Sequence, residues 1–379
     1  MPIGIIKTKL RDKKDHYVAT IYKENREDLK ILPNSILLLE INGEELIKIP
    51  TAIDFHITVP KRIVNNQSNQ IEIRLIGIHD KESSLSRDQE LFVGESINLK
   101  SIIPKKNLFG KKIYVLEEGA YLYVWYPVGG GAKHIKIKKF IEARKLAELM
   151  GFYFGDGNTS KDIRSFRINN CEVSVLNYCL DILEEIGLKR NDFKAQIIYS
   201  TDKGTLSQDI KQRCRSYWSK QLGISKNRIV SVNKSKNKRE TLKYGSARIF
   251  LDNAVLVEIF LHGVLNKILK IIQDPENPVE IKILKGFLRG LAAAEGSVSL
   301  NKHKSLSRIT LSFDPHSEEL ELYKRILNNL GIVSERVHGN ELQIQKISNF
   351  RILKELEIFK MHEKRANKFS LGYANHKFS

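Results

Sequence analysis

Two helical segments of this chain carry a small residue at every fourth position, which restricts what they can pack against. They read LAELMGFYFGDG over residues 146–157 and GFLRGLAAAEG over residues 286–296. When Asp156 is aligned with Glu295, three pairs of small residues coincide: Ala147 with Gly286, Gly151 with Gly290, and Gly155 with Ala294. An interior glycine costs a helix about 1 kcal/mol relative to alanine, and two bare stripes let helix backbones approach more closely than the usual ~8–10 Å. We therefore predict that the two segments pack together, with an interface formed by Ala147, Gly151, Gly286 and Gly290.

Each segment ends in an acid that is followed by a glycine. Asp156 precedes Gly157 and Glu295 precedes Gly296, and glycine suits the left-handed cap at the end of a helix. Both carboxylates then lie at the negative ends of their helices, and helix pairing would bring the two like charges together. An acid at the C-terminal end of a helix is unfavourable, and this arrangement occurs twice, so we expect a functional site here. A divalent cation at this site would reverse the local electrostatics.

The residues that follow the two acids also resemble each other. After Asp156 come RSFRI (164–168) and a segment ending in LEEIGL (183–188); after Glu295 come RITLSF (308–313) and a segment ending in LNNLGI (327–332). Gly187 and Gly331 are the matching helix stops. From residue 140 onward the pattern predicts helices over 140–155, 172–186, 251–270, 278–295 and 317–330, alternating with short strands. The chain thus contains an internal duplication.

The first 138 residues have a different pattern. Short runs rich in β-branched residues, such as SILLLEI (35–41) and IEIRLIGI (71–78), are typical of strands, and Asn42-Gly43 is a strong hairpin signal. We expect an all-β barrel or sandwich in this region. Tyr121, Tyr123 and Trp125 alternate onto one strand face, where they form half of a β core or, alternatively, a surface on which bases stack.

The charge of the chain indicates its partner. The 63 Lys and Arg residues outnumber the 44 Asp and Glu residues, for a net charge of +19, and residues 191–250 alone hold 14 basic and 4 acidic residues. Such a local excess is expected of a protein that binds the phosphate backbone of nucleic acid. No apolar run approaches the ~20 residues that span a membrane, so we expect no membrane partner. Three cysteines without a CxxC pair fit a reducing intracellular compartment, the cytoplasm or an organelle.

With both motifs in order, each followed by the expected strands and helix, residues 140–379 resemble a two-repeat LAGLIDADG homing endonuclease. The resemblance implies an α+β fold with a pseudo-twofold duplicated αββαββα arrangement, in which the motif helices pack at the centre and a curved antiparallel sheet faces double-stranded DNA. It implies a monomer that carries its symmetry internally. The corresponding domains are a β-rich accessory domain of unknown role at 1–138, a first repeat at 139–273 and a second repeat at 274–379.

The resemblance also implies a mechanism, site-specific double-strand cleavage of DNA by metal-dependent phosphodiester hydrolysis. Asp156 and Glu295 would be the catalytic acids, and they would bind Mg²⁺ or another divalent cation together with the carbonyls of Gly155 and Ala294. The candidates for contacts to DNA, some of them also near the attacking water, are Arg164, Arg167, Lys234, Lys236, Lys238, Arg239, Lys243, Arg248, Gln343 and Lys346. His362 is expected at the surface.

Three alternatives remain open at this stage. An RNA-binding maturase would keep the fold and bind intron RNA. A DNA-binding regulator would have lost cleavage, although two retained acids argue against it. An intein is not expected, because the chain starts at Met1 rather than at Cys or Ser and ends in NHKFS rather than in His-Asn.

Overall fold

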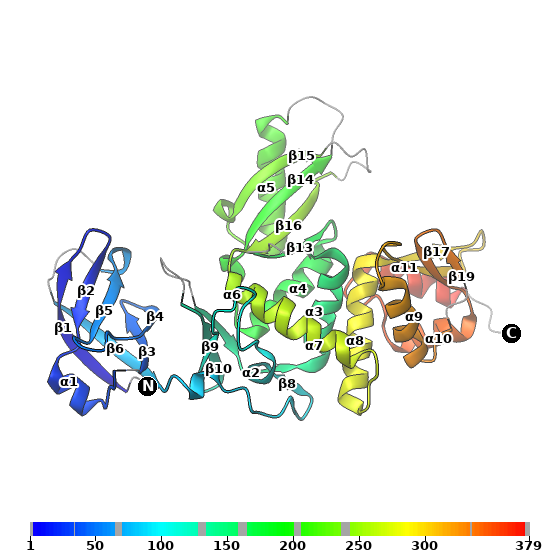
Figure 1. The fold of residues 1–379 in the computed structure, drawn as a ribbon. Helices are drawn as coiled ribbons and strands as arrows, with labels where there is room; N and C mark the ends of the chain where they lie inside the picture. The colour runs from blue at the N-terminus through cyan, green and yellow to red at the C-terminus, as the bar shows by residue number, and fades with distance from the viewer. Residues whose placement is uncertain are drawn as a thin grey trace. The chain divides into compact units, whose positions relative to one another are not determined.

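The computed structural model describes residues 3–33, 35–64, 70–127, 134–157, 165–200, 206–235, 243–333 and 336–375. The chain divides into two compact units. Unit 1 comprises Met1–Gln89 and Pro104–Lys139, and unit 2 comprises Glu90–Ile103 and Phe140–Ser379. Figure 1 shows β-strands in the blue and cyan part of the chain and a mixture of helices and strands in the remainder. The α+β class and the β-rich N-terminal region are therefore confirmed.

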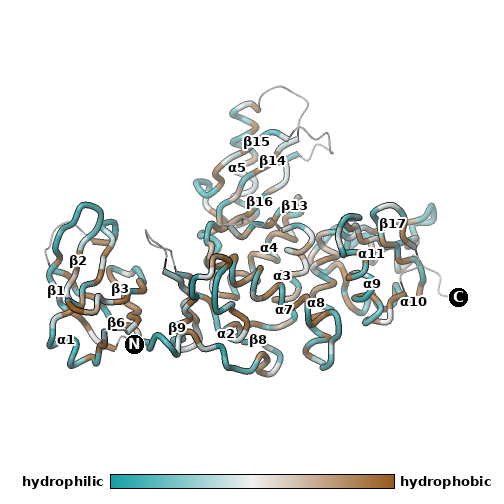
Figure 2. The backbone as a smooth tube through the Cα atoms, in the orientation of Figure 1, coloured by the Kyte–Doolittle hydropathy of each residue, from teal (hydrophilic) through white to brown (hydrophobic). Residues whose placement is uncertain are grey.

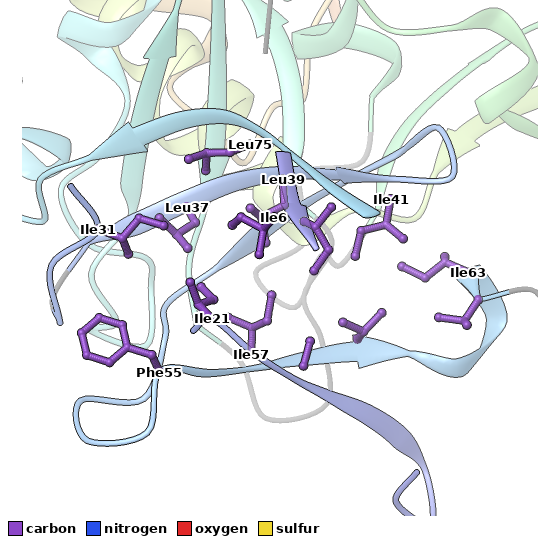
Figure 3. Close-up of a cluster of buried hydrophobic side chains, with 14 residues drawn as sticks. Ile6, Ile21, Ile31, Leu37, Leu39, Ile41, Phe55, Ile57, Ile63 and Leu75 are labelled. Atoms are coloured by element: carbon purple, nitrogen blue, oxygen red, sulfur yellow. The ribbon is translucent and has the colours of Figure 1, made fainter. Parts of the chain in front are cut away.

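Unit 1 is built around a six-stranded sheet of order β4-β3-β6-β1-β2-β5. Its elements are β1 (Gly4–Asp12), β2 (His16–Thr20), α1 (Lys23–Asp28), β3 (Ile36–Ile41), β4 (Glu44–Lys48), β5 (His56–Pro60), a 3₁₀ turn (Lys61–Ile63), β6 (Gln70–His79) and a second 3₁₀ turn (Ser83–Leu85). Side chains from both ends of the sheet enclose one core, and Ile6, Leu39 and Ile57 lie within it (Figure 3). As predicted, Asn42 and Gly43 form the β3–β4 turn, with φ of 50° and 79°.

A three-stranded sheet completes unit 1. It consists of β9 (Tyr114–Glu118), β10 (Tyr121–Trp125) and β11 (Ile135–Lys138), in the order β11-β10-β9. The aromatic row lies on β10. Tyr123 is buried and its hydroxyl donates to Glu45 Oε1 at 3.0 Å, and Trp125 packs on Tyr114 with 5.5 Å between ring centroids. Two of the three rings thus belong to a β core, and Tyr121 alone of the row is exposed.

Residues 90–103 lie within the range expected for the N-terminal domain but fold with unit 2. They contain β7 (Phe92–Val93), β8 (Ser96–Asn98) and α2 (Leu99–Ile102). Strand β8 pairs antiparallel with β12 (Phe140–Glu142), directly before the first motif helix. The backbone hydrogen bonds of this small sheet attach the segment to unit 2, and such a long-range pairing leaves no local sign in the sequence.

The two motif segments form the central helices of unit 2, α3 (Ala143–Asp156) and α8 (Pro278–Glu295), which lie side by side (Figure 1). Asn277 caps α8, since its Oδ1 accepts from the amides of Val279 and Glu280, both at 3.0 Å. Hydrophobic segments run through the helices of unit 2 and through the strands of unit 1 (Figure 2). Among the described residues, no helix has the length and the apolar character needed to cross a membrane.

Each motif helix is followed by a four-stranded sheet. The first contains β13 (Phe166–Asn170), β14 (Lys194–Ser200), β15 (Ile229–Ser235) and β16 (Ser246–Leu251), in the order β13-β16-β14-β15. The second contains β17 (Gly296–Leu300), β18 (Leu306–Ser312), β19 (Arg336–His338) and β20 (Glu341–Ile344), in the order β17-β18-β20-β19. The two sheets thus share an arrangement of three strands, in which the last of the three along the chain lies between the other two: β13-β16-β14 in the first sheet and β18-β20-β19 in the second. Strand β15 is an addition that pairs parallel with β14.

Helices surround these sheets. They are α4 (Val173–Ile186), α5 (Gln208–Leu222), a continuous helical run of α6 (Ala254–Val257), a π-helical segment (Glu258–Leu265) and α7 (Asn266–Ile271), and then α9 (Glu319–Asn329), α10 (Ile347–Glu355) and α11 (Glu363–Ala374). Short 3₁₀ turns occur at Arg190–Asp192 and Lys226–Arg228. The five predicted helices are present, and Gly187 and Gly331 end α4 and α9 with φ of 109° and 72°. Three of these helices, α5, α10 and α11, were not predicted from the sequence.

Candidate functional site

The contact between α3 and α8 is a contact between backbones. A Cβ added to Gly290 would overlap the Glu148 carbonyl and lie 2.5 Å from the Phe152 nitrogen. A Cβ on Gly151 would overlap the Phe287 carbonyl. One on Gly286 would lie 2.5 Å from the Arg144 oxygen and 3.2 Å from Ala147 Cβ, so the structure brings all four expected interface residues together.

A buried ion pair fixes the alignment of these two helices. Arg289 of α8 donates to Glu148 Oε1 of α3 at 2.8 Å, and the two side chains are 8% and 1% exposed. The second carboxylate oxygen of Glu148 accepts from the Tyr178 hydroxyl at 2.6 Å, and Arg289 Nε donates to the Leu356 carbonyl at 2.5 Å. The second terminal nitrogen of Arg289 lies 3.6 Å from Glu357 Oε2, so both charged groups of the pair have partners, which buried charges require.

The two acids lie at the converging C-terminal ends of the helices. A Cβ on Gly155 would lie 2.6 Å from Ala294 Cβ and 3.0 Å from Glu295 Cγ, so there is no free space between the last turns. Burial raises the pKa of Asp156 to about 6. Burial, and then the nearby charges of Asp156 and Glu319, raise the pKa of Glu295 to about 7. The site therefore disfavours negative charge.

The two helix ends are capped by different groups. At the end of α3, Asn170 Nδ2 of β13 donates to Asp156 Oδ2 at 2.9 Å. At the end of α8, one guanidinium nitrogen of Arg365, on α11, donates to the carbonyl oxygens of Ala293 at 2.7 Å and Ala292 at 2.9 Å. The same nitrogen lies 3.5 Å from the Ala294 oxygen. The carboxylate at the end of α3 therefore accepts from an amide, whereas the carbonyls at the end of α8 accept from a cation.

The glycines after the acids do not have the expected left-handed conformation. Gly157 has φ −84° and Gly296 has φ −77°, both in the extended region. A side chain is excluded by space instead, because a Cβ on Gly157 would lie 2.7 Å from the Tyr153 ring and one on Gly296 would lie 2.9 Å from the Phe359 ring. The left-handed cap was thus a wrong prediction, and crowding is the reason for glycine.

The oxygen atoms at the ends of α3 and α8 do not fit the expected magnesium site. Mg²⁺ requires oxygen ligands in near-octahedral geometry at about 2.0–2.1 Å, whereas the carbonyls at the end of α8 already accept from the Arg365 guanidinium. A dication beside the Ala294 oxygen would also be repelled by that guanidinium. Among the residues that the structure describes, no group of three or more His, Cys, Asp or Glu side chains is placed to hold a metal ion.

Two of the expected DNA contacts lie on one face of the first sheet. Phe166 and Ile168 of β13 are buried, so Arg167 and Asn169 point to the opposite face. On β16, Arg248 stands directly across from Asn169. Its Nε donates to Asn169 Oδ1 at 2.8 Å, and a terminal nitrogen lies 3.4 Å from Gln196 Oε1 on β14.

The other residues expected to contact DNA do not form a common cluster among the described residues. Lys234 and Lys243 are exposed on either side of a range that is not described, and Lys346 is exposed before α10. Gln343 is 4% exposed and its Oε1 accepts from Gln345 Nε2 at 3.0 Å. Four candidates lie outside the described residues: Arg164, Lys236, Lys238 and Arg239.

His362 is buried, contrary to expectation. It is 6% exposed and caps α11, where its Nδ1 accepts from the Arg365 amide at 3.3 Å. Its helix packs closely on the second sheet, since a Cβ on Gly372 would lie 3.0 Å from Leu306 atoms. Burial, together with Arg365, lowers the pKa of His362 to about 4.

We expect His362 to make unit 2 less stable in mild acid. Because its pKa is lowered on folding, it contributes stability above pH ~6.5 that is lost as the pH falls towards 4, by about 3 kcal/mol at most. His362→Asn keeps an N-cap but does not titrate, so the difference in unfolding free energy between wild type and variant should change between pH 7 and pH 4.5. Asp156 and Glu295 have raised pKa values, so they stabilise the folded protein as the pH falls. Because both acids are present in wild type and variant, their contributions cancel in this difference. A difference that is constant with pH would contradict the assignment.

Sequence reasoning missed three side chains of the site. Arg365 lies in a polar helix far along the chain, and no local signal connects it with the acids. Asn170 and Gln196 are neutral residues in short strands, and a search for charged residues passes over them. A usable signal was the run Arg167-Ile168-Asn169, whose alternation places two polar side chains on one face of a strand.

Comparison with known proteins identifies one part of the chain. Residues 282–360 match the family described as the LAGLIDADG-like domain. None of the curated proteins compared with the chain matches it. Full-length DUF199/WhiA from Thermatoga maritima is a similar solved structure, at 14% sequence identity and TM-score 0.36, with 62% of each chain covered. The N-terminal LAGLIDADG domain of DUF199/WhiA is similar at 13% identity and TM-score 0.32, with 59% of this chain and 85% of that chain covered. The chain thus spans less than two thirds of the full-length relative.

These findings confirm the resemblance to the LAGLIDADG family and contradict the prediction of a homing endonuclease. The similar solved structures are DUF199/WhiA proteins, and neither is described as an endonuclease. Since TM-scores of 0.36 and 0.32 support no detailed comparison, the function has to be argued from this chain's own surface.

Proposed function

Residues 282–360 form a LAGLIDADG-like domain, and on that premise we propose that the protein binds double-stranded DNA without cutting it. The binding surface is the outward face of strands β13, β16 and β14. The observation that carries the proposal is the charge of the first sheet. Its four strands contain Arg167, Lys194, Lys234 and Arg248 and, within their described ranges, no Asp or Glu.

A row of three polar side chains crosses this face. Asn169, Arg248 and Gln196 stand opposite one another on adjacent strands, and the two amides hold the guanidinium between them. In the major groove, Arg pairs with guanine, and Asn or Gln pairs with adenine. A row whose side chains are already oriented loses less conformational entropy on binding. The arrangement therefore suits the reading of base edges.

A second row is suited to phosphate. Arg167, Phe250 and Lys194 are neighbours in register on the same three strands. The Arg167 guanidinium carbon lies 5.9 Å and the Lys194 Nζ 6.0 Å from the centre of the Phe250 ring. Lys194 also forms an ion pair with Asp252 at 2.9 Å, and both side chains are partly exposed. The ring thus keeps two cations on the surface, where they attract the DNA backbone.

The second sheet would supply the other half of the surface. We assign it to a second repeat because β18-β20-β19 are connected in the order of β13-β16-β14. Its outward positions include Ser299 and Arg308, which are in register on β17 and β18, and Ser297, which is in register with Thr310. Hydroxyl groups contact either bases or phosphates, so this half is expected to add affinity with less charge. Helix α5 and strand β15 extend the basic surface of the first half alone.

We expect Arg248→Ala to weaken binding to a preferred duplex about 10–100-fold and to reduce selectivity at one base pair. The preferred duplex is selected from a random-sequence pool, and affinities are measured by fluorescence anisotropy. Arg325→Ala is the control, since this guanidinium on α9 contacts Gln273 instead. Equal losses on all sequences would show that Arg248 contacts phosphate only. If Arg248→Ala binds the preferred duplex as tightly as the wild type, the row is not part of the binding surface.

Replacement of Arg167, Lys194 and Lys234 by Ala should weaken binding on every sequence. Each lost phosphate contact changes the slope of log K against log salt by about 0.9, so the slope should flatten by up to ~2.7. An unchanged slope would place the DNA on another surface. In the same assays, tighter binding of folded RNA than of duplex DNA would favour a maturase, and strand cleavage on addition of Mg²⁺ would refute the non-cleaving proposal.

A further inference from the structure

A small cavity lies between helix α5 and the end of the first sheet. Helix α5 packs against strand β15, which is the neighbour of β14 (Figure 1). The cavity has a volume of about 150 Å³, room for roughly five water molecules as they occur in the liquid. A cavity of this size holds one small planar molecule. The side chains that line it come from the end of β14, from α5 and from the start of β16: Tyr199, Ile210, Arg213, Cys214, Lys243 and Tyr244.

This cavity is separate from the surface proposed to bind double-stranded DNA. Ala195 and Ile197 of β14 are buried on one face of the sheet, and Tyr199 follows them on that face. Gln196, which belongs to the row proposed to read base edges, lies on the opposite face. A ligand in the cavity would therefore bind at a second site, and the inference below does not rest on the proposed function.

The ring of Tyr244 is held in place at the wall of the cavity. It stacks on Tyr217 with 3.9 Å between ring centroids and 10° between the planes. Trp218 Nε1 donates to the Tyr244 carbonyl at 2.8 Å. Gly245 has φ 71°, and a Cβ there would lie 2.5 Å from the Ile198 carbonyl oxygen, so the backbone is seated tightly on β14. Tyr217 covers one face of the ring, which leaves the other face and the edges for a ligand. A ring that is already held loses little conformational entropy on binding.

Two cations line the same cavity. Arg213 and Lys243 are both exposed, and the Lys243 Nζ lies 5.4 Å from the centre of the Tyr244 ring. Asp209 contacts a terminal nitrogen of Arg213 at 3.0 Å. A guanidinium has five N–H donors, so this contact leaves others for an anion. An aromatic ring beside two cations suits a ligand that is both flat and negatively charged.

We propose that this cavity binds a single nucleotide, with the base against Tyr244 and the phosphate beside Arg213 and Lys243. Bases stack on aromatic side chains with little dependence on sequence, because every base has a π-face. Arginine and lysine form charge-assisted hydrogen bonds with phosphate. Two sources present this same chemistry, an unpaired nucleotide in a nucleic-acid strand and a free nucleoside monophosphate, and the test separates them.

The first arm of the test compares two fluorescein-labelled DNA duplexes by fluorescence anisotropy with the full chain. They are identical except that one strand of the second duplex carries an extra, unpaired adenosine. The wild type should bind the second duplex about tenfold more tightly, the scale of one base stacked on an aromatic ring. Tyr244→Ala should abolish this ratio, and Tyr244→Phe, which keeps the ring, should retain it. Because the ratio is measured, a failure of the outward face to bind DNA would weaken both complexes and leave the preference in place.

The second arm uses AMP as the probe in isothermal titration calorimetry. If AMP binds the wild type but not Tyr244→Ala, and the two duplexes bind equally, the source of the ligand is the free nucleotide. If the unpaired adenosine is preferred, the source is a strand. Equal binding of the two duplexes together with no heat from AMP would overturn the proposal, as would a preference that survives in a folded Tyr244→Ala variant.

Should circular dichroism show that Tyr244→Ala does not fold, the cations decide instead. Arg213 and Lys243 are exposed, so replacing both by Ala should leave the fold intact and should lower the ratio between the two duplexes or, if AMP is the ligand, its affinity. Lys220→Ala, an exposed position on the same helix, is the matched control and should change neither quantity. If the double variant behaves like Lys220→Ala, the cavity does not bind a phosphate and the proposal is wrong.

Discussion

Gly290→Ala should destabilise unit 2 by about 3 kcal/mol or more, near the upper end of the cost of overpacking. The added methyl group would overlap the Glu148 carbonyl and lie 2.5 Å from the Phe152 nitrogen. Both are backbone atoms inside a helix, so no change of rotamer relieves the clash, and the central helices would have to separate. The free energy of unfolding, measured with urea and a probe in unit 2, checks this expectation.

The matched control is Gly4→Ala in unit 1. The added Cβ would lie 2.5 Å from Leu29 Cδ2, which is the end of a flexible side chain. Leu29 can rotate, and we expect a loss of less than about 1.5 kcal/mol, in the range of tolerated core changes. If both variants lose the same free energy, the close approach of α3 and α8 is not what requires glycine.

Glu148→Ala is expected to cost about 3–5 kcal/mol, because Arg289 then keeps only Glu357, a largely exposed carboxylate 3.6 Å away, in place of its buried partner. The double variant Glu148→Leu with Arg289→Met should recover much of this loss, since apolar residues of similar volume often replace a buried pair at no cost. Urea unfolding of the single and double variants measures both values.

An exposed pair provides the comparison. Arg213 binds Asp209 at 3.0 Å on α5, with both side chains largely exposed, and Asp209→Ala should cost no more than about 1 kcal/mol. If Glu148→Ala costs as little as Asp209→Ala, then water reaches Arg289 in the folded protein and the pair is not buried in solution.

Cleavage was the part of the sequence reasoning that failed. It rested on two acids in the right motif, and the motif letters are the same whether or not the acids serve catalysis. The motif does not indicate what surrounds the acids, where Arg365 and Asn170 bind at the two helix ends. Neither residue is near its partner in the sequence, so no local pattern could have indicated them.

Some helices were missed for a related reason. In α5, the buried side chains are Cys214, Trp218 and Leu222, one per turn, and the rest of the helix is polar. Its ends carry clear signals, with Ser207 accepting from the Ile210 amide at 3.3 Å and Gly223 at φ 65°. A narrow apolar stripe is weak evidence for a helix, but the caps were readable.

The sequence by itself determined the elements whose residues are close together in the chain. The hairpin at Asn42-Gly43, the caps at Asn277 and Gly187, and the bare stripes of the two motif helices all follow from local conformational preference and spacing. The tertiary structure alone decided which groups meet. It attached residues 90–103 to unit 2, buried His362, and carried Arg365 to the end of α8. Desolvation and charge act through space, so the chemistry of Asp156 and Glu295 is set by neighbours that only folding brings to them.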